Sequence, residues 1–111
     1  MKDDMVYLEH IIDCIDRIEE YTESDQFTFM NSSMVQDAVI RNLQILSEST
    51  QKISDSLKLQ HPEINWRAIS GFRNVLVHDY LGLDNQQVWQ ILENRLPDLK
   101  EHIEAIISSN R

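Results

Sequence analysis

One short string in this chain of 111 residues combines residue types that can do chemistry, namely Arg73-Asn-Val-Leu-Val-His78-Asp-Tyr80. Histidine gains and loses a proton near neutral pH, and the planar guanidinium group of arginine binds phosphate and carboxylate groups. Composition predicts roughly 0.2 chance occurrences of Arg-x4-His in such a chain, and roughly 0.006 when Tyr must follow two residues later. We therefore treat the string as a candidate functional site.

The string lies at the C-terminal end of an apolar segment, WRAISGFRNVLVHDY, which predicts a buried helix from Trp66 to about Tyr80. On an ideal helix, Asn74 and His78 share a face because they are four residues apart. Arg73 and His78, in contrast, lie about 140° apart around the helix axis. Two arrangements would bring the two groups together: the helix loosens near its end, or a twofold axis sets two copies of the string against each other.

Hydrophobic periodicity predicts three further helices. The first covers about residues 3–23. The second begins at Ser33, whose spacing to Gln36 fits a capping box, and ends at His61-Pro62. The polar stretch SDQFTFMNSS between these two helices is expected to form a turn.

The last helix is expected to start at Asp84 and to continue almost to the end of the chain, with a kink or a break at Pro97. The chain has only two glycines and two prolines, so it lacks the turn residues that a sheet would need. Four antiparallel helices predict an all-α fold, an up-and-down four-helix bundle, formed by a single domain over residues 1–111. Trp66, Phe72 and Trp89 are expected to anchor its core.

Composition narrows the class of protein further. The single cysteine, Cys14, excludes an internal disulfide, and no Cys or His pair has the spacing of a metal site. The N-terminus lacks the pattern of a signal peptide and every apolar run is interrupted by charges, so we expect a cytoplasmic protein with no membrane partner. The glycine-rich phosphate loop and the His-Glu-x-x-His pair of other enzymes are absent.

The formal net charge of -9 argues against a polyanionic partner. The charge is unevenly distributed, however, because residues 1–25 carry -7 of it, whereas basic residues outnumber acidic ones over residues 41–73. The acidic N-terminal part and the mildly basic middle part can therefore face different partners.

The sequence resembles a known family, the HEPN domains, and among them the HepT-like ribonuclease toxins of bacteria and archaea. Besides the string, the resemblance rests on VIRNLQILSEST, on HPEINWRAISGFRNVLVHDYLGLD and on VWQILENRLPDLKEHI, and it covers nearly the whole chain. One departure is Ser47, which stands where we expect many relatives to have a glycine at a close-packed turn of the second helix.

The resemblance implies a homodimer in which two strings face each other across a cleft and cut RNA without a metal ion or another cofactor. It implies that Arg73 clamps the phosphate, that His78 serves as base or acid, and that Asn74 orients either group or donates to a phosphate oxygen. It further implies that a cognate nucleotidyltransferase antitoxin silences the toxin by transferring AMP to Tyr80.

Other interpretations compete with an endoribonuclease toxin. The main alternative is a non-catalytic HEPN binding subunit that docks or presents substrate to a nucleotidyltransferase, and the net charge of -9 favours it. A purely structural dimerisation module would leave the string unexplained.

Single residues have alternative interpretations as well. Arg73 could form a structural ion pair with Asp79 or Glu63. Arg41 and Arg67 either line an RNA path or belong to an ordinary solvated surface. The remaining histidines receive no role from the sequence; they are His10, His61 and His102.

Overall fold

The computed structural model of the protein describes the backbone of residues 2–78 and 84–110, and the side chains of residues 3–72 and 84–110. These residues form helices and no strand, which confirms the all-α prediction. In chain order the helices are α1 (Lys2–Thr22), α2 (Gln26–Met30), α3 (Ser33–Lys52), α4 (Asp55–Gln60), α5 (Trp66–His78), α6 (Asn85–Asn94) and α7 (Leu96–Ser109).

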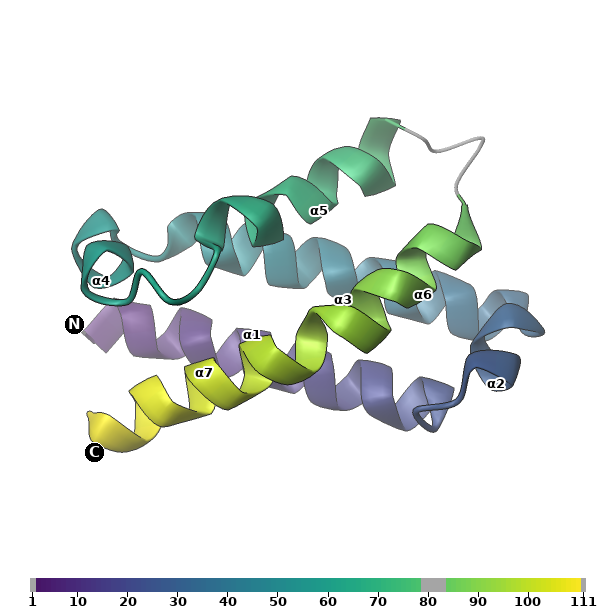
Figure 1. Ribbon diagram of the computed structural model, residues 1–111, viewed down its shortest axis with the longest axis horizontal. Helices are drawn as coiled ribbons and strands as arrows, with labels where there is room; N and C mark the ends of the chain where they lie inside the picture. The colour runs from purple at the N-terminus through teal and green to yellow at the C-terminus, as the bar shows by residue number, and fades with distance from the viewer. Residues whose placement is uncertain (1, 79–83, 111) are drawn as a thin grey trace.

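The long elements form an up-and-down bundle. Helices α1, α3 and α5 and the α6–α7 pair run alternately in opposite directions (Figure 1). Helix α3 contacts both α1 and α5, while α7 packs against α1 and α6 packs against α7 and α2. The described residues extend over 40 × 27 × 20 Å. The predicted four-helix bundle is thus confirmed, with α2 and α4 as short additions.

The last helix is split, as Pro97 predicts. Helix α6 ends at Asn94 and α7 begins at Leu96, so that Pro97 occupies the first turn of α7. A proline is tolerated there because the first turn of a helix has no intrahelical partner for its N–H groups. The predicted cap at the start of α6 is also present, since the Asp84 carboxylate accepts a hydrogen bond from the Gln86 N–H at 2.9 Å.

The second predicted helix is wrong in one respect, because α3 ends at Lys52 and a separate helix, α4, follows it. The break coincides with a contact to α1. The buried carboxylate of Asp4 accepts hydrogen bonds from the Ser54 backbone N–H at 2.8 Å and from the Ser54 hydroxyl at 2.7 Å. The Ser54 hydroxyl in turn accepts from the Leu57 N–H and caps α4. The hydrophobic pattern does not reveal this break, because apolar residues on both sides of it, Ile53 and Leu57, are buried.

The polar stretch before α3 also differs from the prediction, because it contains α2. Asp25 caps this helix by accepting hydrogen bonds from the Thr28 N–H at 3.0 Å and from its hydroxyl at 2.9 Å. Phe29 then turns into the core, where it is fully buried and its ring lies 5.7 Å from that of Trp89. One buried aromatic side chain therefore fixes a segment that looks like a turn.

The cap of α3 is shifted by one residue from its predicted position. Ser32, not Ser33, accepts the hydrogen bond from the Val35 N–H, at 3.2 Å. The Gln36 side chain does not complete a capping box. It donates instead to the backbone carbonyls at the end of α2, those of Phe29 and Met30. Gln36 thereby ties α2 to α3.

The core lies between α1, α3, α5 and the α6–α7 pair. The three predicted anchors are buried, with exposed fractions of 9% for Trp66, 6% for Phe72 and 7% for Trp89. In the described part of the chain, no helix has the length and apolar character needed to cross a membrane. The apolar residues with an exposed fraction of 2% or less are Leu8, Ile11, Ile15, Ile18, Phe29, Val39, Leu43, Leu46, Val88, Leu96 and Ile103.

The contact between Asp4 and Ser54 yields a stability prediction. We expect Asp4→Ala to lower the free energy of unfolding by about 1–3 kcal/mol, because it removes both acceptors at the start of α4. Urea unfolding followed by circular dichroism measures this change. The matched control is Asp3→Ala, which removes the same charge from an exposed position in the same turn of α1. Equal losses in the two variants would show that charge, and not the hydrogen bonds, is responsible.

Candidate functional site

Helix α5, which carries the string, is anchored at its start. The side-chain oxygen of Asn65 accepts a hydrogen bond from the Ala68 N–H at 3.0 Å and so caps the helix. The indole N–H of Trp66 donates to the His61 carbonyl at 3.0 Å. These two bonds set the direction in which α5 leaves the connection from α4.

One side of α5 packs against α3. Ile69 and Phe72 are buried on this side, and the hydroxyl of Ser47 on α3 donates to the Ile69 carbonyl at 3.2 Å. Ser47 is fully buried, so the two helices approach closely at this point. The close-packed turn expected around Ser47 is therefore present, and its hydroxyl forms a bond that a glycine could not form.

The predicted site residues lie at the far end of α5. The backbone of Arg73, Asn74 and His78 belongs to the last turns of the helix, and their side chains lie outside the described residues. Tyr80 lies outside the described residues altogether. Because α5 continues through His78, the helix does not loosen before that residue, and its register keeps Arg73 and His78 on different sides.

Arg67 and Arg41, the two other predicted contacts, are both exposed. Arg67 lies in the first turn of α5, seven residues before Asn74 and eleven before His78, which places all three positions on one face of an ideal helix. Arg41 lies on α3, which runs antiparallel to α5 (Figure 1). The structure therefore brings Arg67 into line with part of the string and places Arg41 on the neighbouring helix.

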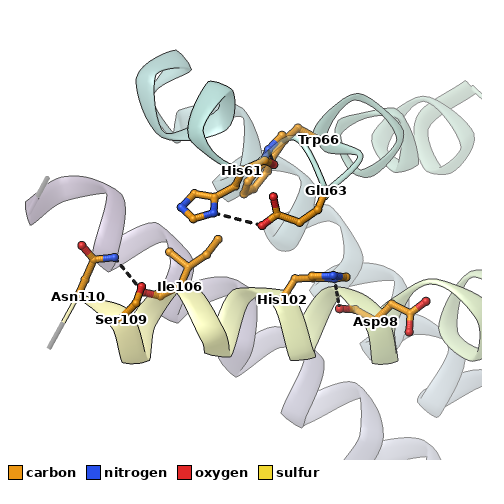
Figure 2. A network of polar contacts seen from close by, with 8 residues as sticks. All are labelled: His61, Glu63, Trp66, Asp98, His102, Ile106, Ser109 and Asn110. Atoms are coloured by element: carbon orange, nitrogen blue, oxygen red, sulfur yellow. Dashed lines mark hydrogen bonds and ion pairs between the residues drawn. The ribbon is translucent and has the colours of Figure 1, made fainter.

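The structure also groups Glu63 with His61 and His102, two histidines to which the sequence assigns no role. Glu63, in the connection between α4 and α5, contacts His61 and lines the same cavity as His102 of α7 (Figure 2). The Nδ1 atom of His61 lies 3.2 Å from a carboxylate oxygen of Glu63. A hydrogen bond from the backbone N–H of Glu63, together with the one from His61, holds the pKa of Glu63 below its ordinary value. Glu63, one of the two partners considered for Arg73, is thus paired with His61.

His102 forms a separate contact within α7. Its Nδ1 atom lies 2.8 Å from the Asp98 carbonyl oxygen, which can only accept, so Nδ1 carries the proton. Glu63 and His102 are 39 residues apart in the sequence. No spacing rule connects positions so far apart, and only the tertiary structure could reveal that both line one cavity.

A cavity of about 190 Å³ adjoins this group, between the start of α5 and the junction of α6 with α7. The residues that line it combine apolar side chains with carboxylates, amides, one histidine and one arginine. Helix register places the cavity on the side of α5 opposite to Asn74 and His78. The lining residues are Glu63, Ile64, Asn65, Ala68, Ile69, Phe72, Asn94, Arg95, Asp98, Leu99 and His102.

Two kinds of chemistry find no support among the described residues. No three His, Cys, Asp or Glu side chains of the described part of the chain are grouped so that they could hold a metal ion. Burial raises the pKa of the Cys14 thiol to about 11, so the thiolate that a nucleophilic cysteine requires is scarce at neutral pH.

Comparison with known proteins then decides the family. The family model described as Ribonuclease HepT-like matches residues 11–106, which include the whole string from Arg73 to Tyr80. The chain belongs to the HepT-like ribonuclease family. This confirms the resemblance noted in the sequence.

Curated relatives of this HepT-like chain carry ribonuclease names. It is 38% identical over 101 residues to "Probable ribonuclease HepT" of Thermococcus cleftensis, a match that covers 90% of this chain and 92% of the relative. It is 34% identical over 107 residues to "Gamma-glutamylcyclotransferase and putative RNase" of Methanocaldococcus jannaschii. That match covers 96% of this chain, which spans only 48% of the relative's length. No solved structure matches the chain.

The close approach of α3 and α5 in the HepT-like chain yields a prediction for Ser47. We expect Ser47→Ala to lower the free energy of unfolding by about 0.5–1.5 kcal/mol through the lost hydrogen bond. Ser47→Leu should lower it further, because the larger side chain has no space between the helices. Urea unfolding measures stability, and hydrogen exchange should show faster exchange along α5 in the leucine variant.

The control for Ser47→Leu is Ser33→Leu, which adds the same side chain at an exposed position of α3. Unchanged exchange along α5 in Ser47→Leu would mean that α5 does not depend on the contact at Ser47.

Proposed function

We propose that this HepT-like chain is a metal-independent endoribonuclease toxin of a toxin–antitoxin pair, with its active site formed by the string at the end of α5. The observation that carries the proposal is membership in the ribonuclease family, since the matched residues include Arg73, His78 and Tyr80. The ribonuclease names of the relatives support the same reaction class.

The string contains the groups that such a reaction needs. The 2′-oxygen of the ribose attacks the adjacent phosphorus and forms a new P–O bond, while the bond from phosphorus to the 5′-oxygen breaks. A base must take the proton of the 2′-hydroxyl, and an acid must protonate the leaving 5′-oxygen. His78 carries these protons in the proposal, Arg73 neutralises the charge on the phosphate, and Asn74 orients one of these groups.

The position of His78 supports its role. Carbonyl groups at the C-terminal end of a helix carry partial negative charge, which favours the protonated form of a nearby histidine. His78 is the last residue of α5. A histidine in this position is well suited to act as the acid, and a second, neutral histidine is then needed as the base.

A homodimer would supply that second histidine. Within one chain, the register of α5 keeps Arg73 and His78 on different sides, as described above. If two copies place their strings across a cleft, the Arg73 of one copy can approach the His78 of its partner. One His78 then acts as base and the other as acid, and the cleft between them receives the RNA.

The distribution of charge is compatible with an RNA substrate despite the net charge of -9. The acidic residues of α1 are separated from α5 by α3, which lies between them (Figure 1). Charges further apart than about 10 Å are largely screened at an ionic strength of 0.1 M. The negative charge of α1 therefore weakens the potential along α5 less than the total charge indicates, and the exposed Arg41 and Arg67 lie on α3 and α5 themselves.

The test of the proposal is cleavage of a mixed single-stranded RNA in EDTA, with no antitoxin present. We expect the wild-type protein to cut and His78→Ala to lose roughly 10²- to 10⁴-fold in rate, because the proton carrier is lost. The matched control is His10→Ala, which removes an exposed histidine from α1 and should leave the rate unchanged.

The wild-type protein must be dimeric in this assay, and mass spectrometry must show that Tyr80 is unmodified. If it does not cut RNA under these conditions, the chain is a binding subunit and not a nuclease. Equal rates for wild type and His78→Ala would instead place the catalytic group elsewhere.

We further propose that Tyr80 is the point of control by a cognate nucleotidyltransferase. The Tyr80 oxygen attacks the α-phosphorus of ATP, pyrophosphate leaves, and the phenolic proton is released. The attached AMP adds negative charge close to Arg73 and repels RNA. The location of Tyr80, two residues after His78, supports this proposal, because a group attached there would lie next to the active site.

Tyr80→Phe separates catalysis from control. We expect this variant to cut RNA as fast as wild type, yet to gain no adenylyl mass and to stay active after incubation with the antitoxin and ATP. The control is Tyr21→Phe, since Tyr21 is a partly exposed tyrosine on α1, far from the string in sequence. Loss of cleavage in Tyr80→Phe would contradict a purely regulatory role for the hydroxyl group.

A further inference from the structure

Gly71 lies inside α5, where a glycine is unfavourable. Glycine destabilises a helix interior relative to alanine, because its backbone loses more freedom on folding. A positive φ angle would justify a glycine, but no described glycine has one. Lack of space would also justify it, yet a Cβ atom added at Gly71 would meet no described atom within 4 Å. The described residues therefore give no reason for a missing side chain at this position.

The surroundings of Gly71 show what lies on this part of α5. Helix register puts five positions on one face, with spacings of three, four, seven and eleven residues from the first. None of them is apolar, and we call them the α5 stripe: Arg67, Ser70, Gly71, Asn74 and His78. Trp66, Ile69 and Phe72 are buried instead, and face the core.

The composition of the α5 stripe favours one class of binding partner over another. The centre of an interface between two protein chains is usually apolar and depleted of charge. A nucleic acid strand, in contrast, is held by arginine side chains and by polar groups that contact its phosphates. The exposed Arg67 at one end of the stripe and the absence of apolar residues favour RNA over a second copy of the chain.

The length of the stripe sets a minimum for the substrate. Arg67 and His78 are eleven residues apart, which corresponds to about 16 Å along a helix. A phosphate held by Arg67 therefore cannot be the phosphodiester that is cut at His78. It must belong to another nucleotide of the same strand.

We propose that Arg67 binds a second phosphate of the RNA, and that Gly71 leaves the surface between Arg67 and His78 bare so that the strand lies directly along α5. This inference rests on the proposed function and deepens it. Arg67 is a positioning residue, and its contribution grows with the length of the substrate. A dinucleotide has a single phosphodiester, and when this is at His78 nothing remains for Arg67 to bind.

The first experiment compares cleavage of a dinucleotide with cleavage of a single-stranded RNA of about ten nucleotides, a length chosen to exceed the span of the stripe. We expect Arg67→Gln to raise KM for the longer RNA several-fold, with kcat unchanged, and to leave cleavage of the dinucleotide unaltered. The control is Arg17→Gln, which removes an exposed arginine from α1. An equal loss of activity on both substrates would show that Arg67 supports the fold or the reaction itself and not a second phosphate, and that outcome would overturn the proposal.

A second experiment tests Gly71. We expect Gly71→Gln to weaken binding and cleavage of the longer RNA while its thermal midpoint stays equal to wild type or rises, because glutamine favours the helix more than glycine does. Ala105→Gln is the control, since it adds a comparable side chain at an exposed position of α7. Dissociation of a dimer by Gly71→Gln, measured by sedimentation, would assign the bare surface to a second copy and overturn the assignment to RNA.

Binding separates this proposal from the proposed function. A strand of the same length built from 2′-deoxy nucleotides lacks the attacking 2′-hydroxyl and cannot be cut by this reaction, so that its affinity can be measured by fluorescence anisotropy. We expect Arg67→Gln to reduce the slope of log affinity against log salt by about 0.7, the value for one phosphate of a single strand. If wild type binds with this dependence on Arg67 but cuts no RNA, the nuclease proposal fails and the phosphate site stands. An unchanged slope in Arg67→Gln would remove the phosphate site, whatever the cleavage assay shows.

Discussion

The close packing of α5 against α3 decides which side of α5 is buried and which side another molecule can reach. At the point of contact, the fully buried Ser47 donates a hydrogen bond to the Ile69 carbonyl and leaves no space between the two helices. Trp66, Ile69 and Phe72 turn toward the core as a result. The polar positions of α5 are left on the outer side, and helix register extends this side to Asn74 and His78.

The bundle also separates charges. Helix α1 and the turn after it carry most of the negative charge, and Lys100 of α7 neutralises part of it through ion pairs of 2.9 Å with Asp16 and 3.4 Å with Glu19. Helix α3 stands between α1 and α5 (Figure 1). A chain that is acidic as a whole can therefore present a helix with exposed arginine to a polyanion, because local charges and not the total determine the potential near a site.

The two sides of the first turns of α5 differ in character. One side adjoins the cavity near Glu63 and His102, where carboxylates, amides, one histidine and one arginine are mixed with apolar side chains. The other side is the α5 stripe, which has an arginine and no carboxylate among its five positions. On the cavity side the two carboxylates of Glu63 and Asp98 outnumber the single arginine, Arg95, whereas the stripe has an arginine and no carboxylate to repel an anionic strand. This difference is the electrostatic reason for placing RNA on the stripe.

Much of the fold could be predicted from the sequence, because helical periodicity and the helix break at Pro97 depend on residues that are close together in the chain. The scarcity of glycine added to this, since it spoke against a sheet. The family and its string are recognisable for the same reason, since Arg73, His78 and Tyr80 are neighbours in the chain. The break between α3 and α4 could not be predicted, because Asp4 and Ser54 are 50 residues apart. The same holds for α2, which depends on the packing of Phe29 against Trp89, and for the cavity that Glu63 shares with His102. The sequence by itself determined the helices and the candidate residues, whose signals are local. Only the tertiary structure decided which face of α5 is buried and what surrounds Gly71, since these depend on contacts between residues that are distant in the chain.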